Sequence, residues 1–68
     1  DFAEVLLEEL QSSPEGFLPF TDKSSSEAIS ARFSVSKKTF KRAVGTLYRA
    51  HMITLSDTGL HLAKKGGE

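Results

Sequence analysis

Five basic side chains are concentrated in residues 36–51, a stretch that contains no acidic residue. They are Lys37, Lys38, Lys41, Arg42 and Arg49, out of nine lysines and arginines in the chain. Ammonium and guanidinium groups bind the phosphates of nucleic acids, and such contacts supply affinity without reading the base sequence. The cluster therefore predicts a surface that binds a polyanion.

The rest of the chain offsets this positive charge, because the formal net charge is zero. Residues 1–15 contain five acidic residues and no basic one, whereas residues 16–35 and 52–68 are each balanced. A neutral domain with one strongly positive segment is typical of a module that lays this segment against phosphates. The competing interpretation is that the five cations are only solvated, and are attracted to the acidic first segment.

Helical periodicity indicates how the basic cluster reaches the solvent. Apolar residues at helical spacing form an inward stripe of Phe40, Val44, Leu47 and Tyr48, with Ala43 beside it. Ser36 is a suitable N-cap, so Lys37 and Lys38 fall in the first turn of this helix. The helix dipole disfavours cations there by about 0.3–1 kcal/mol each. Because the sequence breaks this local rule, we interpret the cluster as functional.

Two other residues of the same helix have more than one interpretation. Gly45 costs about 1 kcal/mol relative to alanine in a helix interior. Either a phosphate backbone approaches the bare helix surface at Gly45, or a neighbouring helix packs close to it, and we prefer the packing interpretation. Gly45 nevertheless joins the five cations as a candidate nucleic-acid-binding residue. Tyr48 is expected to be a core residue whose hydroxyl reaches the surface, with stacking on a base as a secondary possibility.

The remaining polar residues indicate neither a metal site nor a catalytic site. His51 and His61 have no carboxylate or thiol set at ligand spacing, and the chain has no cysteine. His51 is expected to cap the end of the basic helix, where positive charge is favourable. No nucleophile–base pair and no phosphate-binding glycine loop is present. We therefore predict no enzyme activity, no metal, no cofactor and no small-molecule substrate.

The apolar pattern also predicts the elements before the basic helix. Residues 2–10 form an amphipathic helix whose apolar positions are Phe2, Val5, Leu6 and Leu10. Residues 17–20 are a short extended segment, which Pro19 restricts to a sheet edge. A second helix begins after Ser24, which forms a capping box with Glu27, or after the competing cap Ser25. A tight turn of residues 34–36 leads into the basic helix.

After the basic helix the apolar period changes to strict alternation. Ile53 and Leu55 are predicted to pair with Leu60 and Leu62 in a β-hairpin, whose loop uses a positive φ at Gly59. The order of helix, short strand, helix, turn, longer helix and hairpin is that of a small winged helix–turn–helix, an α+β fold. We assign residues 1–63 to this domain and 64–68 to a flexible tail, and interpret the chain as a fragment of a longer protein.

Residues 16–62 resemble the C-terminal winged-helix domain of the conserved virulence factor B (CvfB, YitL-like) family of bacterial RNA-binding proteins. The shared features are Leu18-Pro19, Asp22-Lys23-Ser24-Ser25, Phe33, Ser36-Lys37-Lys38, Phe40-Lys41, Ala43, Gly45, Leu47-Tyr48, Ile53 and Gly59-Leu60. One departure is Ser26, where the family pattern has a proline. The resemblance implies tandem OB-fold RNA-binding domains ahead of this one in the same chain, and a cytoplasmic role in RNA binding or regulation.

Three functions remain open on these grounds. The first is an auxiliary RNA-binding module that holds phosphates with the basic helix. The second is a double-stranded DNA-binding regulator domain with the basic helix in the major groove, although the hairpin loop lacks lysine and arginine, and only Lys64 and Lys65 beyond it can substitute. The third is a winged helix that docks on another protein domain. No apolar run approaches the roughly 18 residues of a membrane span, so no membrane partner is expected.

Overall fold

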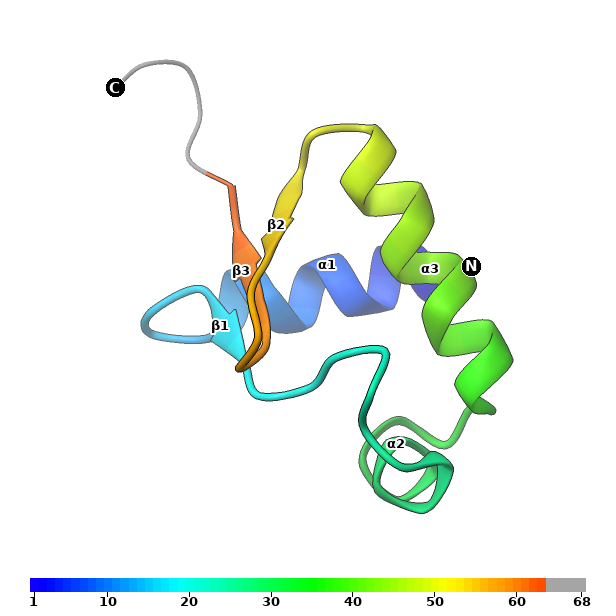
Figure 1. The fold of residues 1–68 in the computed structure, drawn as a ribbon. Coiled ribbons are helices and arrows are strands. Elements are labelled where there is room, and N and C mark those ends of the chain that lie inside the picture. Colours follow the sequence, from blue (N-terminus) through cyan, green and yellow to red (C-terminus); the bar gives the residue numbers. More distant parts are fainter. Residues whose placement is uncertain (64–68) are drawn as a thin grey trace.

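The computed structural model describes residues 1–63. Its elements, in order, are α1 (Phe2–Ser12), β1 (Phe17–Leu18), α2 (Ser26–Phe33), α3 (Lys37–Arg49), β2 (Ile53–Leu55) and β3 (Leu60–Leu62) (Figure 1). This order confirms the predicted winged helix–turn–helix. The predicted flexible tail, 64–68, lies outside the described residues.

The three short strands form one antiparallel sheet with the order β1-β3-β2. Ile53 pairs with Leu62 and Leu55 with Leu60, as the alternating pattern predicts. Strand β1 pairs only with β3, so it is an edge strand. The edge position explains how the chain accommodates Pro19 directly after β1, because a proline nitrogen has no hydrogen to donate to a sheet.

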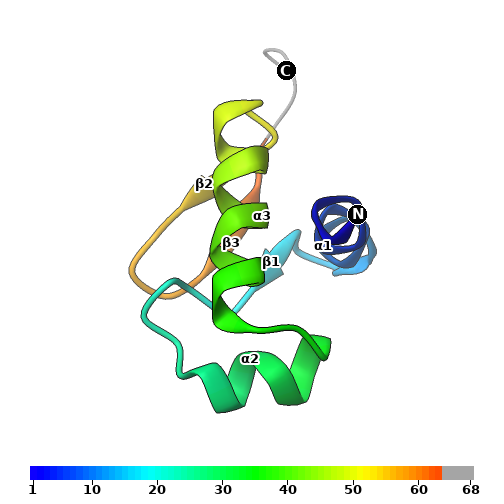
Figure 2. The same cartoon turned by 90° about the vertical axis from the view of Figure 1, so that its right-hand side faces the viewer.

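Helix α3 packs against α1, α2 and β2. In Figure 2, α1 lies on one side of α3, the β2–β3 hairpin lies on the other, and α2 crosses its first turn. Buried side chains from all six elements form one core, made of Ala3, Leu6, Leu10, Leu18, Ile29, Phe40, Ala43, Val44, Leu47, Ile53 and Leu60. No element of residues 1–63 covers the face of α3 turned toward the viewer in Figure 2.

An aromatic cluster fixes α2 against α3. The ring of Phe33 lies 5.2 Å from that of Phe20 and 5.6 Å from that of Phe2, both edge to face, and stacks on Phe40 at 5.7 Å. Such pairs contribute about 0.5–1.5 kcal/mol each beyond the area they bury. The turn after Phe33 is closed by Ser34 in the left-handed region, with φ 61°. These contacts hold α2 against the first turn of α3.

One local prediction for α1 is wrong, and one of the two caps considered for α2 is confirmed. Val5 is 47% exposed, because the buried stripe of α1 runs through Ala3 and Leu6 and leaves Val5 to one side. The N-cap of α2 is Ser25, whose Oγ accepts a hydrogen bond from the backbone N–H of Ala28. The other candidate cap, Ser24, instead accepts a hydrogen bond from the N–H of Thr21 and closes the preceding turn.

The expected positive φ at Gly59 is also wrong, because only Gly16 among the described glycines has one. The reason for a glycine at position 59 is space. A Cβ there would lie 2.1 Å from the carbonyl oxygen of Leu18 and under 3 Å from the ring of Phe17. Glycine therefore lets β1 approach the start of β3.

Candidate nucleic-acid interface

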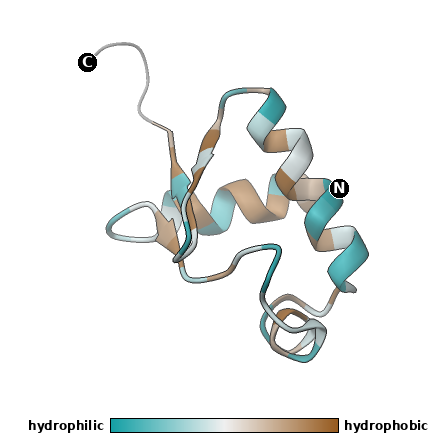
Figure 3. Cartoon of the chain, viewed as in Figure 1, coloured by the Kyte–Doolittle hydropathy of each residue, from teal (hydrophilic) through white to brown (hydrophobic). Residues whose placement is uncertain are grey.

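Helix α3 begins with a well-formed cap. Ser36 has extended backbone angles, and its Oγ accepts a hydrogen bond of 3.1 Å from the N–H of Thr39. This confirms the predicted N-cap. The first turn contains no acidic residue, so Lys37 and Lys38 lie at the positive end of the helix dipole. In Figure 3 this end of α3 is coloured as hydrophilic.

The helical repeat separates the basic residues of α3 from its buried stripe. Phe40, Ala43, Val44 and Leu47 are buried, whereas Lys38, Lys41, Arg42 and Arg49 are exposed and Lys37 is half-buried. Lys38, Arg42 and Arg49 are spaced by four and seven residues, close to one and two turns of about 3.6 residues each. We call these three the outer ridge, because they line up on the side of α3 away from the core.

The acidic residues of α1 do not hold the outer ridge. Among residues 1–63 there is one ion pair, between Arg32 of α2 and Glu9 of α1, at 2.6 Å. None of the five cations of α3 forms an ion pair within the described residues. No ion pair therefore supports the interpretation in which the acidic residues of α1 attract these side chains. The outer ridge is open to solvent.

Gly45 lies on an open part of the helix surface. A Cβ built there would meet nothing within 4 Å, so the expected close packing of a neighbouring helix is wrong. Tyr48 is 53% exposed, so the expected core position is wrong as well. Tyr48 follows Val44 by four residues and Gly45 by three, and therefore lies on the flank of α3 beside the buried stripe. The side chains of Phe40, Ala43, Val44 and Leu47 make the buried contacts of α3 with the rest of the core, so Tyr48 is not needed there.

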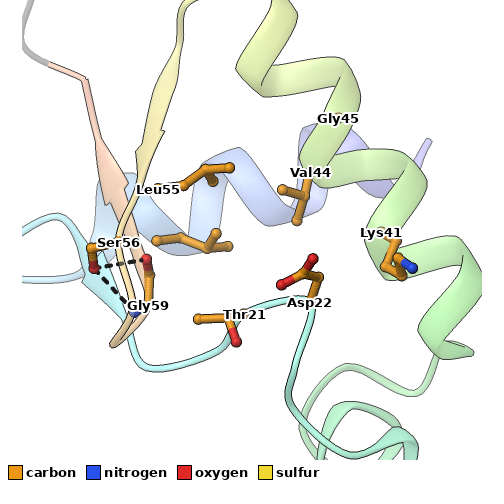
Figure 4. A pocket seen from close by; sticks show the side chains of 9 residues that line it. Thr21, Asp22, Lys41, Val44, Gly45, Leu55, Ser56 and Gly59 are labelled. Atoms are coloured by element: carbon orange, nitrogen blue, oxygen red, sulfur yellow. Dashed lines mark hydrogen bonds between the residues drawn. The ribbon is translucent and has the colours of Figure 1, made fainter.

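A groove separates this flank of α3 from the β2–β3 hairpin. It has a volume of about 190 Å³ and is lined by Thr21, Asp22, Lys41, Val44, Gly45, Leu55, Ser56, Gly59 and Leu60 (Figure 4). Lys41 and Gly45 are predicted site residues that the structure places here, apart from the outer ridge. Sequence reasoning missed Asp22 and Leu55, because no local spacing links a loop residue and a hairpin residue to α3.

His51 ends α3 through its backbone. It has φ 63°, its N–H donates to the carbonyl of Tyr48, and the N–H of Met52 donates to the carbonyl of Leu47. These two bonds and the left-handed residue define a Schellman motif. His51 therefore occupies a position that usually holds glycine, and the predicted location at the helix end is correct.

Neither a metal cluster nor a membrane span is found in the part of the chain that the structure describes. Residues 1–63 hold no group of three or more histidine, cysteine or carboxylate side chains placed to bind a metal ion. No helix among them is long and apolar enough to cross a membrane.

The order and arrangement of the six elements agree with the comparison to known families. The model of the CvfB-like winged helix domain matches residues 4–62. The chain belongs to this family. The resemblance seen in residues 16–62 is thereby confirmed and extends into α1.

Relatives of this CvfB-like domain are longer proteins. Conserved virulence factor B of Staphylococcus haemolyticus is 52% identical over 52 residues, and that of Staphylococcus saprophyticus is 50% identical over 52 residues. In each case the match covers 76% of this chain and 17% of the relative. A crystal structure from Streptococcus pneumoniae, described as a multidomain protein with nucleic acid binding domains, aligns with a TM-score of 0.83 and 38% identity. That alignment covers 88% of this chain and 21% of the other.

Proposed function

We propose that this CvfB-like domain is an auxiliary RNA-binding module that contacts phosphates through α3. The outer ridge supplies three of the contacts, and Lys37 and Lys41, one helical turn apart, add charge on the neighbouring flank of α3. The observation that carries the proposal is an exposed row of cations without an ion-pair partner in residues 1–63, on a face of α3 that no described element covers. The solved relative, described as having nucleic acid binding domains, supports the same class of ligand.

Single-stranded RNA fits the charges of the domain better than duplex DNA. A wing that grips a duplex carries cations, whereas the β2–β3 loop, residues 56–59, contains Asp57 and no lysine or arginine. The net charge of the whole chain is zero, so only one face attracts phosphates. Duplex DNA is the second candidate, because the α2–turn–α3 arrangement presents α3 as a recognition helix does in the major groove.

The domain acts in this proposal together with other domains of the same chain, in the bacterial cytoplasm. The family resemblance implies OB-fold RNA-binding domains ahead of it, and the matched relatives are several times longer than this chain. Tethering to a strand-binding domain raises the effective concentration of RNA at α3, so a few phosphate contacts are sufficient. The proposed role is binding, with no catalytic step.

The experiment measures binding of the 68-residue chain to labelled single-stranded RNA, single-stranded DNA and duplex DNA across a salt series. The variant Lys38→Gln with Arg42→Gln removes two ridge cations. We expect it to weaken RNA binding whatever the sequence, and to lower the log–log salt slope by about 1.4, since each phosphate contact on a single strand contributes about 0.7. A matched control, Gln11→Glu with Ser30→Glu, changes the net charge equally at exposed positions of α1 and α2.

The control variant is expected to bind nearly as the parent chain does. Equal loss in both variants would mean that net charge rather than α3 controls the affinity, and would contradict the proposal. A tenfold preference for duplex DNA would favour the second candidate. Absence of binding to every nucleic acid would instead favour a winged helix that docks on a protein domain.

A further inference from the structure

We propose that the groove between α3 and the β2–β3 hairpin binds one unstacked guanine base of the RNA strand. This inference rests on the proposed function, because the outer ridge must first hold the phosphates of that strand. The groove is smaller than the roughly 300 Å³ and above of pockets for drug-sized ligands, and a single planar ring system is the kind of group it can hold.

The walls of the groove suit the faces of a base. Val44 and Leu55 present aliphatic surface from α3 and from β2, and Leu55 is 49% exposed although it belongs to the sheet. Gly45 leaves the helix surface bare beside Val44, with nothing within 4 Å of where a Cβ would lie. A flat ring can therefore reach the backbone of α3. Unstacked bases of single-stranded RNA are held in this way, by contacts with their faces and hydrogen bonds to their edges.

Asp22 determines which chemical group can enter. Its side chain points toward the groove from the β1–α2 loop, and it has no hydrogen-bond or ion-pair partner among residues 1–63 (Figure 4). An ionised carboxylate only accepts hydrogen bonds, and it repels phosphate. Phosphate is therefore disfavoured beside Asp22 and favoured at the outer ridge. A neutral group rich in donors is favoured at Asp22.

Asp22 and Lys41 together match one base edge. Guanine presents two neighbouring donors, N1–H and the N2 amino group, and beside them the acceptor O6. A carboxylate accepts from both donors, and a lysine ammonium donates to O6. Adenine, cytosine and uracil each present at most one donor on this edge. Asp22 and Lys41 line the groove from different elements, the β1–α2 loop and α3, so after a rotation of the lysine side chain the two charges can contact different atoms of one ring (Figure 4).

The test uses a seven-nucleotide oligouridine and three relatives in which the central base is guanine, adenine or cytosine. We expect the 68-residue chain to bind the guanine oligonucleotide about tenfold more tightly than the others, the usual scale for one bidentate base contact. Asp22→Asn keeps the side-chain shape but mixes donor and acceptor. It is expected to abolish the preference for guanine while leaving binding of oligouridine unchanged or stronger.

A second variant tests the groove without altering charge. Gly45→Leu fills the open space at α3 and is expected to remove the guanine preference, whereas Thr46→Leu adds similar bulk at an exposed position outside the groove and is expected to retain it. Circular dichroism confirms that each variant is folded.

The outcomes separate this inference from the proposed function. Equal affinity for all four oligonucleotides, lost on mutation of Lys38 and Arg42, would overturn the guanine site and leave the ridge in place. Asp22→Asn strengthening all four equally would show that Asp22 only repels phosphate, and would overturn the site too. No binding of any oligonucleotide would overturn both proposals.

Discussion

The guanidinium of Arg32 donates a hydrogen bond of 2.6 Å to the Glu9 carboxylate, and so joins α2 to α1. The same guanidinium lies 5.0 Å from the ring centre of Phe33. Glu9 thus contacts a cation of α2 rather than one of α3, although the strongest positive charge in the chain is on α3. This pairing is consistent with an outer ridge that remains open to a polyanion.

Loss of the Arg32–Glu9 pair should affect stability but not RNA binding. Both side chains are more than a third exposed, so solvent screens the pair and its contribution is at most about 1 kcal/mol. We expect Arg32→Gln to lower the free energy of unfolding, measured in urea, by no more than about 1 kcal/mol, and by less at high salt. A weakened affinity for oligouridine in this variant would place Arg32 in the binding surface and contradict the assignment to α3 alone.

The first turn of α3 should show opposite effects on stability and binding. Lys38 is exposed and lies at the positive end of the helix dipole. Replacing it by glutamate is favourable for the helix by about 0.3–1 kcal/mol, and at the same time removes a ridge cation. We expect Lys38→Glu to unfold at higher urea concentration than the parent chain and to bind RNA more weakly. Lower stability together with unchanged binding would rule out a functional reason for this lysine.

Gly45→Ala should stabilise the domain. No atom lies within 4 Å of the added methyl group, so the substitution introduces no clash. Alanine is favoured over glycine in a helix interior by about 1 kcal/mol. The free energy of unfolding, measured by urea titration, is expected to rise by about 0.5–1 kcal/mol. A decrease would mean that a segment packs against Gly45 in solution.

Gly59→Ala should instead lower the free energy of unfolding. The added Cβ would lie 2.1 Å from the carbonyl oxygen of Leu18, so β1 must move away from β3 to accept it. Overpacking of this kind costs about 1–3 kcal/mol. We expect a clear loss of stability in the same urea titration that shows a gain for Gly45→Ala. Two gains would contradict the close approach of β1 to Gly59.

His51→Gly tests the cap at the end of α3. His51 has φ 63°, a conformation that costs an L-residue with a side chain about 1–2 kcal/mol relative to glycine. The variant is expected to raise the free energy of unfolding by about 1 kcal/mol. The capping hydrogen bonds come from the backbone, so the variant keeps the end of α3 intact. Because His51 is not part of the outer ridge, RNA binding should be unchanged. A loss of stability would show that the histidine side chain itself supports the helix end.

Local periodicity was sufficient to predict the helices and strands and the exposure of the basic residues of α3. The alternation of Ile53, Leu55, Leu60 and Leu62 predicted the hairpin register, and Ser36 predicted the start of α3, because both depend on neighbours a few residues away. The apolar stripe likewise predicted that Lys38, Lys41, Arg42 and Arg49 project toward solvent, and all four are exposed. The direction of a helical side chain follows from its own helix once the buried stripe is known.

The sequence by itself determined the winged helix–turn–helix order, the family and the concentration of positive charge on α3. Only the tertiary structure decided that Gly45 and Tyr48 are open, that Gly59 makes room for β1, and that Asp22 and Leu55 meet Lys41 at one groove. These facts depend on which surfaces of distant elements approach one another. Contacts between residues far apart in the chain are set by the packing of the whole core, and no local pattern encodes them.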